Sequence, residues 1–535
     1  FEPATPGTTN QCSNQLSYIR HTPTFRGRLP PNPAECKQFF YIGSQDSTTL
    51  VHFYHRIYPV VCFIIQTNER ILSMLSPIKI YNVLTHKKEE FRPLREGKVA
   101  MYACGITVSG DAHIGHAYQS VIFDMITKYF EYRGYDVTYV RNYTDVDDKI
   151  IANAAMVGED PIMFAEKFIN KTNSEMDALG NTRPTIEPRA TQNITEIIDF
   201  VRHLIDKGHA YAAECGNVYF SVKSFPGYGK LSHIQVHENE IAVRKDLEPG
   251  KIDSADFALW KSAKPGEISW DSPWGKGRPG WHIECSAMNL ANLGEQIDIH
   301  GGGRDLIFPH HENEIAQTEA LTGKKFANFW IHSGLVKING QKMSKSLGNG
   351  ITLHDMLARY DTDTIRFALL RNTYSSDIDV TDTFFTDAAA QIYKMYSVMA
   401  TATANNDFDS SELVSDFMAA MDDNFNTSAA FAVIFKYLNL LHDIKSIQLA
   451  IKIKELMAIF NILQKNPTEY IQAVREKVLS KNNVTKSEIS AKITERAHLK
   501  SKRDYVGADA IRSELLEKHI ILRDFPTGTT WDVEL

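Results

Sequence analysis

The sequence predicts an α/β protein built on a Rossmann-type parallel sheet, and two patterns of apolar residues support this prediction. From Ile78 onward, short apolar runs bounded by turn residues alternate with stretches of helical periodicity, as in strands joined by crossover helices. From Thr386 to about Asn466, apolar residues recur at intervals of three and four, which predicts a helical bundle. At 535 residues the chain is too long for one core, so several domains are expected.

The clearest unit of the predicted sheet begins with the apolar, strand-like run 99–104. A turn-rich stretch follows, and apolar residues then fall on one helical face that extends to Phe130. The next strand is expected over 137–140. Because open parallel sheets bind ligands beyond the carboxyl ends of their strands, function is expected in the loop formed by residues 104–116.

The remaining boundaries follow from changes in the pattern. Gln296–His300 predicts another strand, three glycines follow it, and Pro309 is expected to open the next helix. The expected organisation is an N-terminal extension of unassigned role (1–73), a Rossmann-type catalytic domain (74–335) with an insertion around 211–270, a loop and connecting region (336–385), a helical bundle (386–480) and a small C-terminal domain (481–535).

Composition excludes some classes of protein. Six cysteines in a chain of this length do not make a disulfide scaffold and favour metal binding or reactivity. No apolar run is long enough to span a bilayer, so no membrane location is expected. The formal net charge of -7 gives no global attraction to a polyanion, so any nucleic-acid surface must be a local patch.

Residues 1–73 lack sustained periodicity, and basic residues slightly outnumber acidic ones there. A cytoplasmic location is expected, and import into an organelle through this segment stays open. Met74 as the native initiator is a further hypothesis.

Two short motifs indicate nucleotide chemistry. His113–His116 (His-Ile-Gly-His) stands where a loop enters a helix, so backbone N–H groups and imidazoles can face a phosphate. Lys342–Ser346 (Lys-Met-Ser-Lys-Ser) lies in a loop bracketed by Gly340 and Gly348, and offers two ammonium groups to a leaving pyrophosphate. Taken alone, the residues of each motif could equally well form a packed or solvated loop with no role in nucleotide binding. Together, in this order, they make His113, His116, Lys342 and Lys345 candidate catalytic residues.

Cys104, Cys285, His310 and Glu314 are far apart in the sequence but all fall at predicted sheet-edge loops. Two thiolates, an imidazole and a carboxylate form an acceptable zinc set. By residue type alone, small core cysteines and a helix-surface His–Glu pair explain the same residues. The metal site is therefore one of two readings of these positions.

With these residues the chain resembles the cysteinyl-tRNA synthetases, which are class I aminoacyl-tRNA synthetases, over nearly all of residues 77–531. The segments that carry the resemblance are Met101–Val108, His113–His116, Asn142–Asp148, Gly280–Met288, Asp298–Gln317 and Lys342–Ser346.

The resemblance implies that a Rossmann-type domain activates L-cysteine with ATP, with Mg²⁺ accompanying the ATP, and transfers cysteine to the 2′-OH at the end of tRNA(Cys). Zinc on Cys104, Cys285, His310 and Glu314 would bind the substrate thiolate, and since zinc prefers sulfur to a hydroxyl it would disfavour serine. In the same way, the amino-acid pocket would include Thr144 and Trp281, and ATP would contact Gly115, Gly301, Gly303, Asp305 and Lys345.

An RNA surface is expected near the C-terminus, because basic residues outnumber acidic ones between Arg475 and Arg503. The resemblance implies a small anticodon-recognition domain there. Its implied tRNA contacts are Arg496, Arg503, Tyr505, Asp509, Arg512 and Trp531. After Trp531 the chain departs from the family, since Asp532 and Glu534 replace a basic end.

Two alternatives were weighed against this reading. A ligase that transfers cysteine to an amino sugar would share the motifs and the zinc set but lack a full anticodon domain. A catalytically silent RNA-binding paralogue would have lost motif residues, and none is lost here. A monomer is expected.

Overall fold

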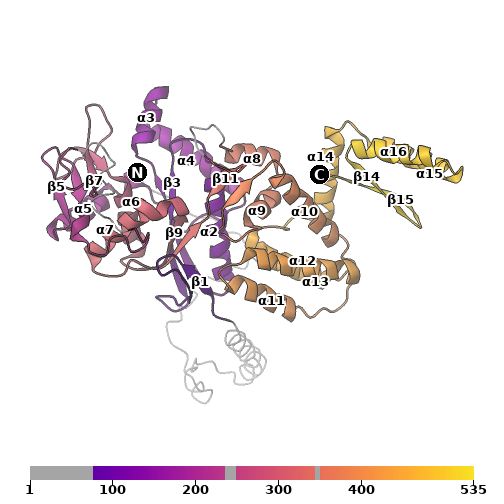
Figure 1. Ribbon diagram of the computed structural model, residues 1–535, viewed down its shortest axis with the longest axis horizontal. Coiled ribbons are helices and arrows are strands. Elements are labelled where there is room, and N and C mark those ends of the chain that lie inside the picture. The colour runs from indigo at the N-terminus through magenta and orange to yellow at the C-terminus, as the bar shows by residue number, and fades with distance from the viewer. Residues whose placement is uncertain (1–75, 235–248, 344–349) are drawn as a thin grey trace, which may run out of the picture. The chain divides into compact units, whose positions relative to one another are not determined.

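The predicted parallel sheet is confirmed. The computed structural model describes residues 76–234, 249–343 and 350–535, and Figure 1 shows β3 and β9 side by side within it. The spatial order is β10-β9-β3-β4, and every neighbouring pair is parallel. The strands are β3 (Lys98–Thr107), β4 (Asp136–Thr144), β9 (Ile297–Gly303) and β10 (Ala327–Ser333). Because β4 follows β3 on one side and β10 follows β9 on the other, the topological switch point lies between β3 and β9, where such sheets bind ligands.

Two strands are longer than expected. β3 continues past Cys104 to Thr107, and β9 continues past His300 through the glycines to Gly303. Residues 104–107 are therefore strand rather than loop. Sequence periodicity ends at these positions because polar or small residues replace the apolar ones, although the backbone pairing goes on.

A β-bulge explains the extension of β3. The register of β3 against β4 shifts between Ala103 and Ile106. A Cβ on Gly105 would lie 1.6 Å from the Asn142 carbonyl oxygen, so only glycine lets the two strands approach here. The Gly105 N–H donates to Asn142 Oδ1 at 2.8 Å, which fixes the bulge.

Helices join and cover the sheet. α2 ends before Gly134, as predicted, and most of its length is buried. The stretch predicted as helical near 150–210 contains three further helices. The bounds of α2 and of these three helices are α2 (Ile114–Tyr132), α3 (Asp148–Val157), α4 (Pro161–Ala178) and α5 (Ile194–Asp206).

The expected insertion contains an antiparallel sheet with a core of its own. Its order is β5-β6-β7-β8, and it extends to Pro279, beyond the expected end near residue 270. Its buried residues, Trp260 among them, pack with those of α5 and α6. The bounds are β5 (Ala210–Ala212), β6 (Val218–Phe220), β7 (Phe257–Ser262), β8 (Gly277–Pro279) and α6 (Trp281–Leu293).

The helix after β9 does not begin at Pro309 as predicted. Phe308 has extended backbone angles (φ -135°, ψ 131°) inside a short π-type turn, η6 (Ile307–His311), and α7 (Glu312–Thr322) follows. The interruption at Phe308 separates Pro309 from a regular helix start. His310 consequently lies in the turn before α7, while Glu314 lies in its first turn.

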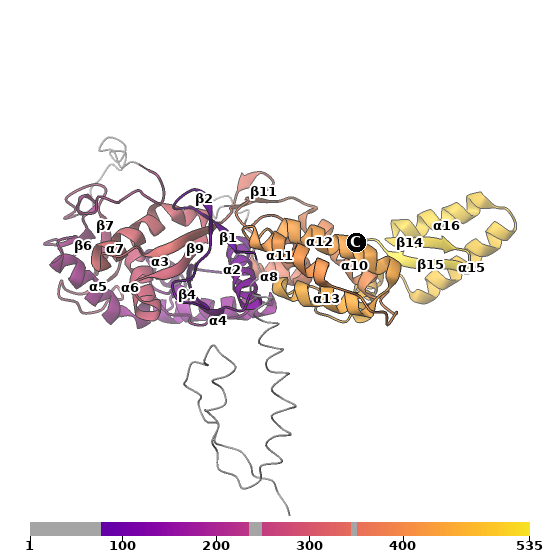
Figure 2. The same cartoon turned by 90° about the horizontal axis from the view of Figure 1, so that it is seen from below.

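A connecting region links the sheet to the helical bundle. It contains β11 (Val336–Ile338), β12 (Gln341–Lys342), α8 (Leu353–Arg359), α9 (Thr362–Leu370) and β13 (Ile378–Val380). The bundle helices, grouped together in Figure 2, are α10 (Phe384–Met399), α11 (Ser411–Asp422), α12 (Thr427–Ile444) and α13 (Ile447–Met457), followed by η8 (Ala458–Phe460). β1 (Lys79–Asn82) and β2 (Lys87–Glu90) form a hairpin beside β10.

The C-terminal part consists of three helices and a β-hairpin; the first and third of these helices contact the hairpin, and the second packs on the third. Its elements are α14 (Pro467–Lys481), α15 (Lys486–Ser501), α16 (Tyr505–Glu517), β14 (Ile520–Phe525) and β15 (Gly528–Val533). Among the described residues, no helix combines the length and the apolar character needed to cross a membrane.

Candidate metal and nucleotide site

The four predicted metal ligands meet at the switch point of the parallel sheet. Cys104 lies at the bulge of β3, Cys285 in the second turn of α6, His310 in η6 and Glu314 in the first turn of α7. All four are buried, and their ligand atoms lie within 4.8 Å of one another. Zinc with bonds of about 2.0–2.3 Å needs ligand atoms roughly 3.3–3.8 Å apart, so small side-chain adjustments would complete a tetrahedral site.

Glu314 is central to this metal cluster. Its Oε1 lies 3.1 Å from Cys104 Sγ and 3.1 Å from His310 Nε2, while its Oε2 lies 2.9 Å from His300 Nε2. Burial alone would raise the pKa of this carboxyl, but the neighbouring His300 and His310 hold the pKa below its usual value. The carboxylate is therefore ionised at neutral pH and favours a cation beside it.

His310 is oriented by two aromatic neighbours. Its Nδ1 lies 2.9 Å from His282 Nδ1, so its Nε2 is the nitrogen that faces Glu314. Such a hydrogen bond to the second ring nitrogen is how proteins orient metal-binding histidines. The Trp281 ring stacks on the His310 ring at 4.1 Å between centroids and is 38 % exposed. Trp281, expected in the amino-acid pocket, thus lies against the metal cluster and is open to solvent.

The two thiols also fit a bound cation. Burial raises the pKa of Cys104 well above its usual value and also raises the pKa of Cys285. Without a cation, both side chains are neutral thiols beside an ionised carboxylate. A thiophilic divalent cation would bind both as thiolates, and the set of two sulfurs, one nitrogen and one oxygen suits zinc.

Buried histidines behind the cluster were not found from the sequence. His300, His311 and His332 are all buried, and His311 Nδ1 lies 2.8 Å from His332 Nε2. Cys104, His300 and His311 form a second group whose geometry could hold a metal. The only sequence feature that could have indicated them is a histidine, His300, within an apolar strand run. Such a histidine is equally typical of a core position.

Polar residues of β4 support the cluster from the other side. Asn142 Oδ1, which fixes the β3 bulge, also lies 3.6 Å from Cys285 Sγ. Thr144, the second residue expected in the amino-acid pocket, is buried and donates to Glu284 Oε2 at 2.8 Å. Thr144 is therefore held against α6, and the contacts of Asn142 are a feature that the sequence alone did not reveal.

The first turns of α2 lie close to the metal cluster, because Gln119 donates to the Cys104 carbonyl at 2.7 Å. His113 is its N-cap: the imidazole accepts from the Gly115 N–H, and His116 Nδ1 accepts from the His113 N–H at 3.3 Å. The two rings stack at 3.6 Å between centroids. Because a helix N-terminus attracts anions, this end of α2 can take a phosphate.

The second nucleotide motif is brought to the first. Lys342 ends β12, which pairs with β11, and on the far side of the loop the Ile351 carbonyl accepts from the Ile114 N–H at 2.9 Å. A Cβ added to Gly115 would lie 3.6 Å from Met343 Cε. The predicted residue Lys345 lies outside the described residues.

The glycines at the end of β9 have different surroundings from those expected. A Cβ on Gly301 would lie 2.4 Å from the Ile331 carbonyl oxygen and 2.5 Å from the Phe123 ring, so this glycine permits packing between β9, β10 and α2. A Cβ on Gly303 would meet the Asp305 carboxylate at 2.5 Å. Of the residues expected near adenosine, Gly303 and Asp305 lie at the open end of the strand, whereas Gly301 is enclosed.

The predicted tRNA contacts divide into exposed and buried residues. Arg496 is 2 % exposed and binds Asp524 with both terminal nitrogens, at 2.8 and 3.0 Å. It thus holds α15 to the hairpin instead of facing a ligand, which corrects the expectation of an RNA contact. The exposed members are Arg503, Tyr505, Asp509 and Arg512, with Arg503 in the turn between α15 and α16. Trp531 is half-buried beneath the Arg475 guanidinium, 5.3 Å from its ring centroid.

Comparison with known proteins identifies the family. A model described as the catalytic domain of class I (C) tRNA synthetases matches residues 90–390, and a DALR domain model matches residues 416–465, from within α11 to just beyond η8. A cysteine–tRNA ligase from Thermodesulfovibrio yellowstonii is 44 % identical over 491 residues, which covers 86 % of this chain and 100 % of the relative. One from Laribacter hongkongensis is 43 % identical and covers 85 % of this chain and 99 % of the relative.

Among solved structures, methionyl-tRNA synthetase of Mycobacterium tuberculosis in complex with methionyl-adenylate covers 73 % of this chain and 95 % of that one, at 14 % identity and a TM-score of 0.49. On the sequence matches, the chain belongs to the cysteine–tRNA ligase family of class I aminoacyl-tRNA synthetases.

Proposed function

We propose that this enzyme selects L-cysteine with a zinc ion held by Cys104, Cys285, His310 and Glu314. The convergence of these four buried ligand atoms carries the proposal. Bound zinc would take the substrate thiolate as a further ligand, and its preference for sulfur would disfavour serine. Because an apolar pocket separates such near-isosteres only weakly, the metal would supply the selectivity.

In activation, an oxygen of the cysteine carboxylate bonds to the α-phosphorus of ATP while the bond from that phosphorus to the bridging oxygen of the β-phosphate breaks, which gives cysteinyl-adenylate and releases pyrophosphate. The carboxylate is ionised at neutral pH, so positioning and charge neutralisation are what the protein must supply. His113 and His116 at the N-terminus of α2, together with Lys342 and Lys345, would bind the phosphates, and Mg²⁺ would accompany ATP. Thr144 and Trp281 would orient the amino acid beside the metal, and Gly115, Gly303 and Asp305 would contact the nucleotide.

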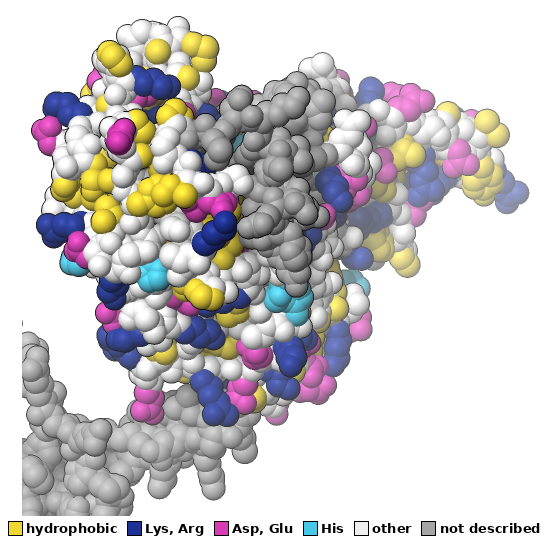
Figure 3. Space-filling view, turned by 60° about the vertical axis from the view of Figure 1, so that its left-hand side comes forward, with side chains coloured by type: hydrophobic (Ala, Val, Ile, Leu, Met, Phe, Trp, Pro, Cys, Tyr) yellow, Lys and Arg dark blue, Asp and Glu magenta, His cyan; other side chains and the backbone are white. Residues whose placement is uncertain are grey.

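The tRNA would reach the adenylate with its terminal ribose hydroxyl while its distal part contacts the C-terminal domain. The exposed residues Arg503, Tyr505, Asp509 and Arg512 are the proposed contacts there, with Trp531 at the edge of the hairpin. Figure 3 shows acidic and basic side chains interspersed over one face, which fits local contacts better than a broad basic surface. The monomeric state and the cytoplasmic location expected from the sequence stay predictions.

Replacing Cys285 tests the metal proposal. Cys285→Ser should remove zinc and lower cysteine-dependent ATP–pyrophosphate exchange by about 100-fold or more, since a hydroxyl is a poor zinc ligand at neutral pH. Zinc content is measured in the same preparation by atomic absorption.

Cys215→Ser is the matched control, because Cys215 is exposed and outside the cluster. It should keep both zinc and exchange activity. Full zinc content with normal exchange in Cys285→Ser would refute the metal role.

A further inference from the structure

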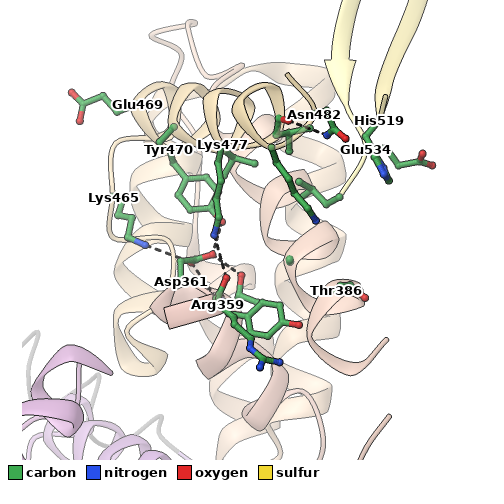
Figure 4. A pocket seen from close by; sticks show the side chains of 18 residues that line it. Arg359, Asp361, Thr386, Lys465, Glu469, Tyr470, Lys477, Asn482, His519 and Glu534 are labelled. Atoms are coloured by element: carbon green, nitrogen blue, oxygen red, sulfur yellow. Dashed lines mark hydrogen bonds and ion pairs between the residues drawn. The ribbon is translucent and has the colours of Figure 1, made fainter. Parts of the chain in front are cut away.

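A cavity of about 630 Å³ lies away from the metal cluster, between the end of α8 and the helices α10 and α14 (Figure 4). α14 forms one wall with residues spaced at helical intervals, and α10 contributes Thr386 and Ala389. His519 and Glu534, from the C-terminal domain, close one end. The cavity thus lies where the connecting region, the bundle and the C-terminal domain meet.

The walls of the cavity are mostly apolar. The ring of Tyr470, which is one of the lining residues, is already in contact with other side chains. Its ring stacks on Tyr396 at 3.9 Å between centroids, and the Lys465 ammonium lies 5.3 Å from its centroid. Lys465 is also paired with Asp361 and Asp363, at 3.5 and 3.3 Å. A nucleobase therefore has no exposed stacking surface on this ring, and Lys465 is already neutralised.

Three other cations at the cavity are not neutralised. Lys477 and Lys481 stand four residues apart on α14, so their like charges repel on one helix face. Lys477 donates to the Arg359 carbonyl at 3.2 Å, which brings the end of α8 beside them. Among the described residues, no ion pair involves the Arg359 guanidinium or the ammonium groups of Lys477 and Lys481.

Of the carboxylates that line the cavity, which include the terminal group of Leu535, none forms an ion pair with Arg359, Lys477 or Lys481 among the described residues. In Figure 4, Lys477 points from α14 toward Arg359, whereas Glu469 and Glu534 point away from the cavity. Asp361 is occupied by Lys465. A chain with a formal net charge of -7 thus gathers three unpaired cations at one hollow, which makes the hollow complementary to phosphate.

The C-terminal hairpin is held at this cavity by Asp532. Its Oδ1 accepts from Arg475 on α14 at 3.0 Å and from Tyr393 on α10. Asp532 is 7 % exposed. The acidic residue that departs from the family's basic end is therefore a docking contact, and it keeps His519 and Glu534 at the end of the cavity.

We infer that this cavity is a contact site for the phosphodiester backbone of the tRNA substrate, with Arg359, Lys477 and Lys481 as the phosphate-binding groups. The inference rests on the chain acting on tRNA. The three cations support the inference, since each Lys or Arg that neutralises a phosphate releases a counterion and so favours binding. The position of the cavity supports it too, because the cavity lies between the connecting region that carries the nucleotide loop and the domain proposed to read the anticodon.

The double variant Lys477→Gln/Lys481→Gln tests the site. Its KM for tRNA in cysteine charging should rise about 10-fold. The slope of the logarithm of tRNA affinity against the logarithm of salt concentration should become shallower, by the amount expected for about two lost phosphate contacts. ATP–pyrophosphate exchange, which uses no tRNA, should keep its wild-type KM for ATP and cysteine. Lys477→Arg/Lys481→Arg should restore tRNA affinity, because arginine keeps the charge.

Lys87→Gln/Lys264→Gln is the matched control, because these exposed lysines remove the same charge far from the cavity in sequence and line none of it. An unchanged KM for tRNA in the cavity variant, or an effect equal to the control's, would overturn the inference. So would a raised KM for ATP with tRNA affinity unchanged, since the cavity would then serve a free nucleotide. Failure of the ligase assignment itself would appear differently, as absent charging in the unmodified enzyme.

Discussion

Gly105 shows how the absence of one side chain can place a candidate metal ligand, Cys104. The close approach of β3 to β4 at this residue creates the bulge that turns Cys104 toward Glu314. A bulge re-aims the neighbouring side chain, which a regular strand would direct elsewhere. The position of Cys104 therefore depends on a backbone contact as much as on the thiol.

Gly105→Ala should consequently cost both stability and metal. The added methyl meets backbone, which cannot rotate away, so we expect a destabilisation of about 2–4 kcal/mol and a loss of zinc. Urea unfolding and zinc analysis measure the two effects. Gly350→Ala is the control, because a Cβ there has nothing within 4 Å; equal stability of the two variants would show that β4 yields at little cost.

His332 provides a pH-dependent contribution to stability. Burial lowers the pKa of His332 to about 3, far below the usual value near 6.5. The unfolded chain therefore binds this proton more readily than the folded one. The stability from keeping His332 neutral is complete above pH 6.5 and is lost as pH falls toward 3.

His332→Gln should remove this proton-linked term. Between pH 6 and 4 the slope of unfolding free energy against pH should become shallower by about 1.4 kcal/mol per pH unit. The measurement is denaturant unfolding at several pH values, with His442→Gln as an exposed control. An unaltered slope would mean that His332 is protonated in the folded protein.

At the residue scale, sequence and resemblance pointed to the four candidate metal ligands that the structure brings together, because cysteine, histidine and glutamate have side chains that can bind a metal. The positions of His300, His311 and Asn142 beside the cluster were not predicted. A buried histidine or asparagine gives the same sequence pattern whether it contacts a metal ligand or only packs in the core. Arg496 was expected at the surface for the opposite reason: a basic residue in a basic run gives no sign that Asp524, 28 positions later, will bury it.

At the scale of elements, α9 connects the sheet to the bundle through one buried cation. Arg366 is fully buried, and its guanidinium binds Asp124 of α2 at 2.5 Å, Asn181 after α4 and the Phe460 carbonyl of η8. α2 also carries the His113–His116 motif at its other end. The helix that presents the nucleotide motif is thus tied to the bundle by side-chain contacts.

Arg366→Met should be strongly destabilising, by about 3–5 kcal/mol, because it leaves Asp124 buried without its main partner. Arg366→Met/Asp124→Leu should recover part of that loss, since neither member of the fully buried pair is then left alone, although Lys128 also loses its contact with Asp124. Urea midpoints of the single and double variants measure the difference. If the double variant is no more stable than the single one, the bonds to Asn181 and Phe460, rather than the ion pair, carry the energy.

The ends of helices and strands were predicted well where turn residues mark them. They were predicted poorly where a strand stays paired with its neighbour beyond the last apolar residue of its sequence pattern. Gly134 ended α2 as expected, because glycine accepts the left-handed conformation found there (φ 86°). The extensions of β3 and β9 were missed, as was the late start of α7. In each case a contact with a distant strand or an unusual turn, rather than local sequence, sets the boundary.

At the scale of the whole molecule, the C-terminal domain should act on tRNA alone. Ending the chain after Thr485 should leave ATP–pyrophosphate exchange within about two-fold of the full chain, while charging efficiency falls by about 100-fold, because phosphate contacts are lost together. Asp532→Ala keeps the domain but removes its docking contacts, so it should give an intermediate loss. Undiminished charging by the shortened chain would show that the anticodon assignment is wrong.

The placement of the metal ligands also has a consequence for biosynthesis. Cys104 and Glu314 are 210 positions apart, and the entire insertion is made between Cys104 and Cys285. Contacts of such long range form late in folding. A ribosome-bound chain that ends before Glu314 lacks one of the four ligands of the proposed zinc site, so that site is complete only after β3, β4, the insertion and β9 have been synthesised.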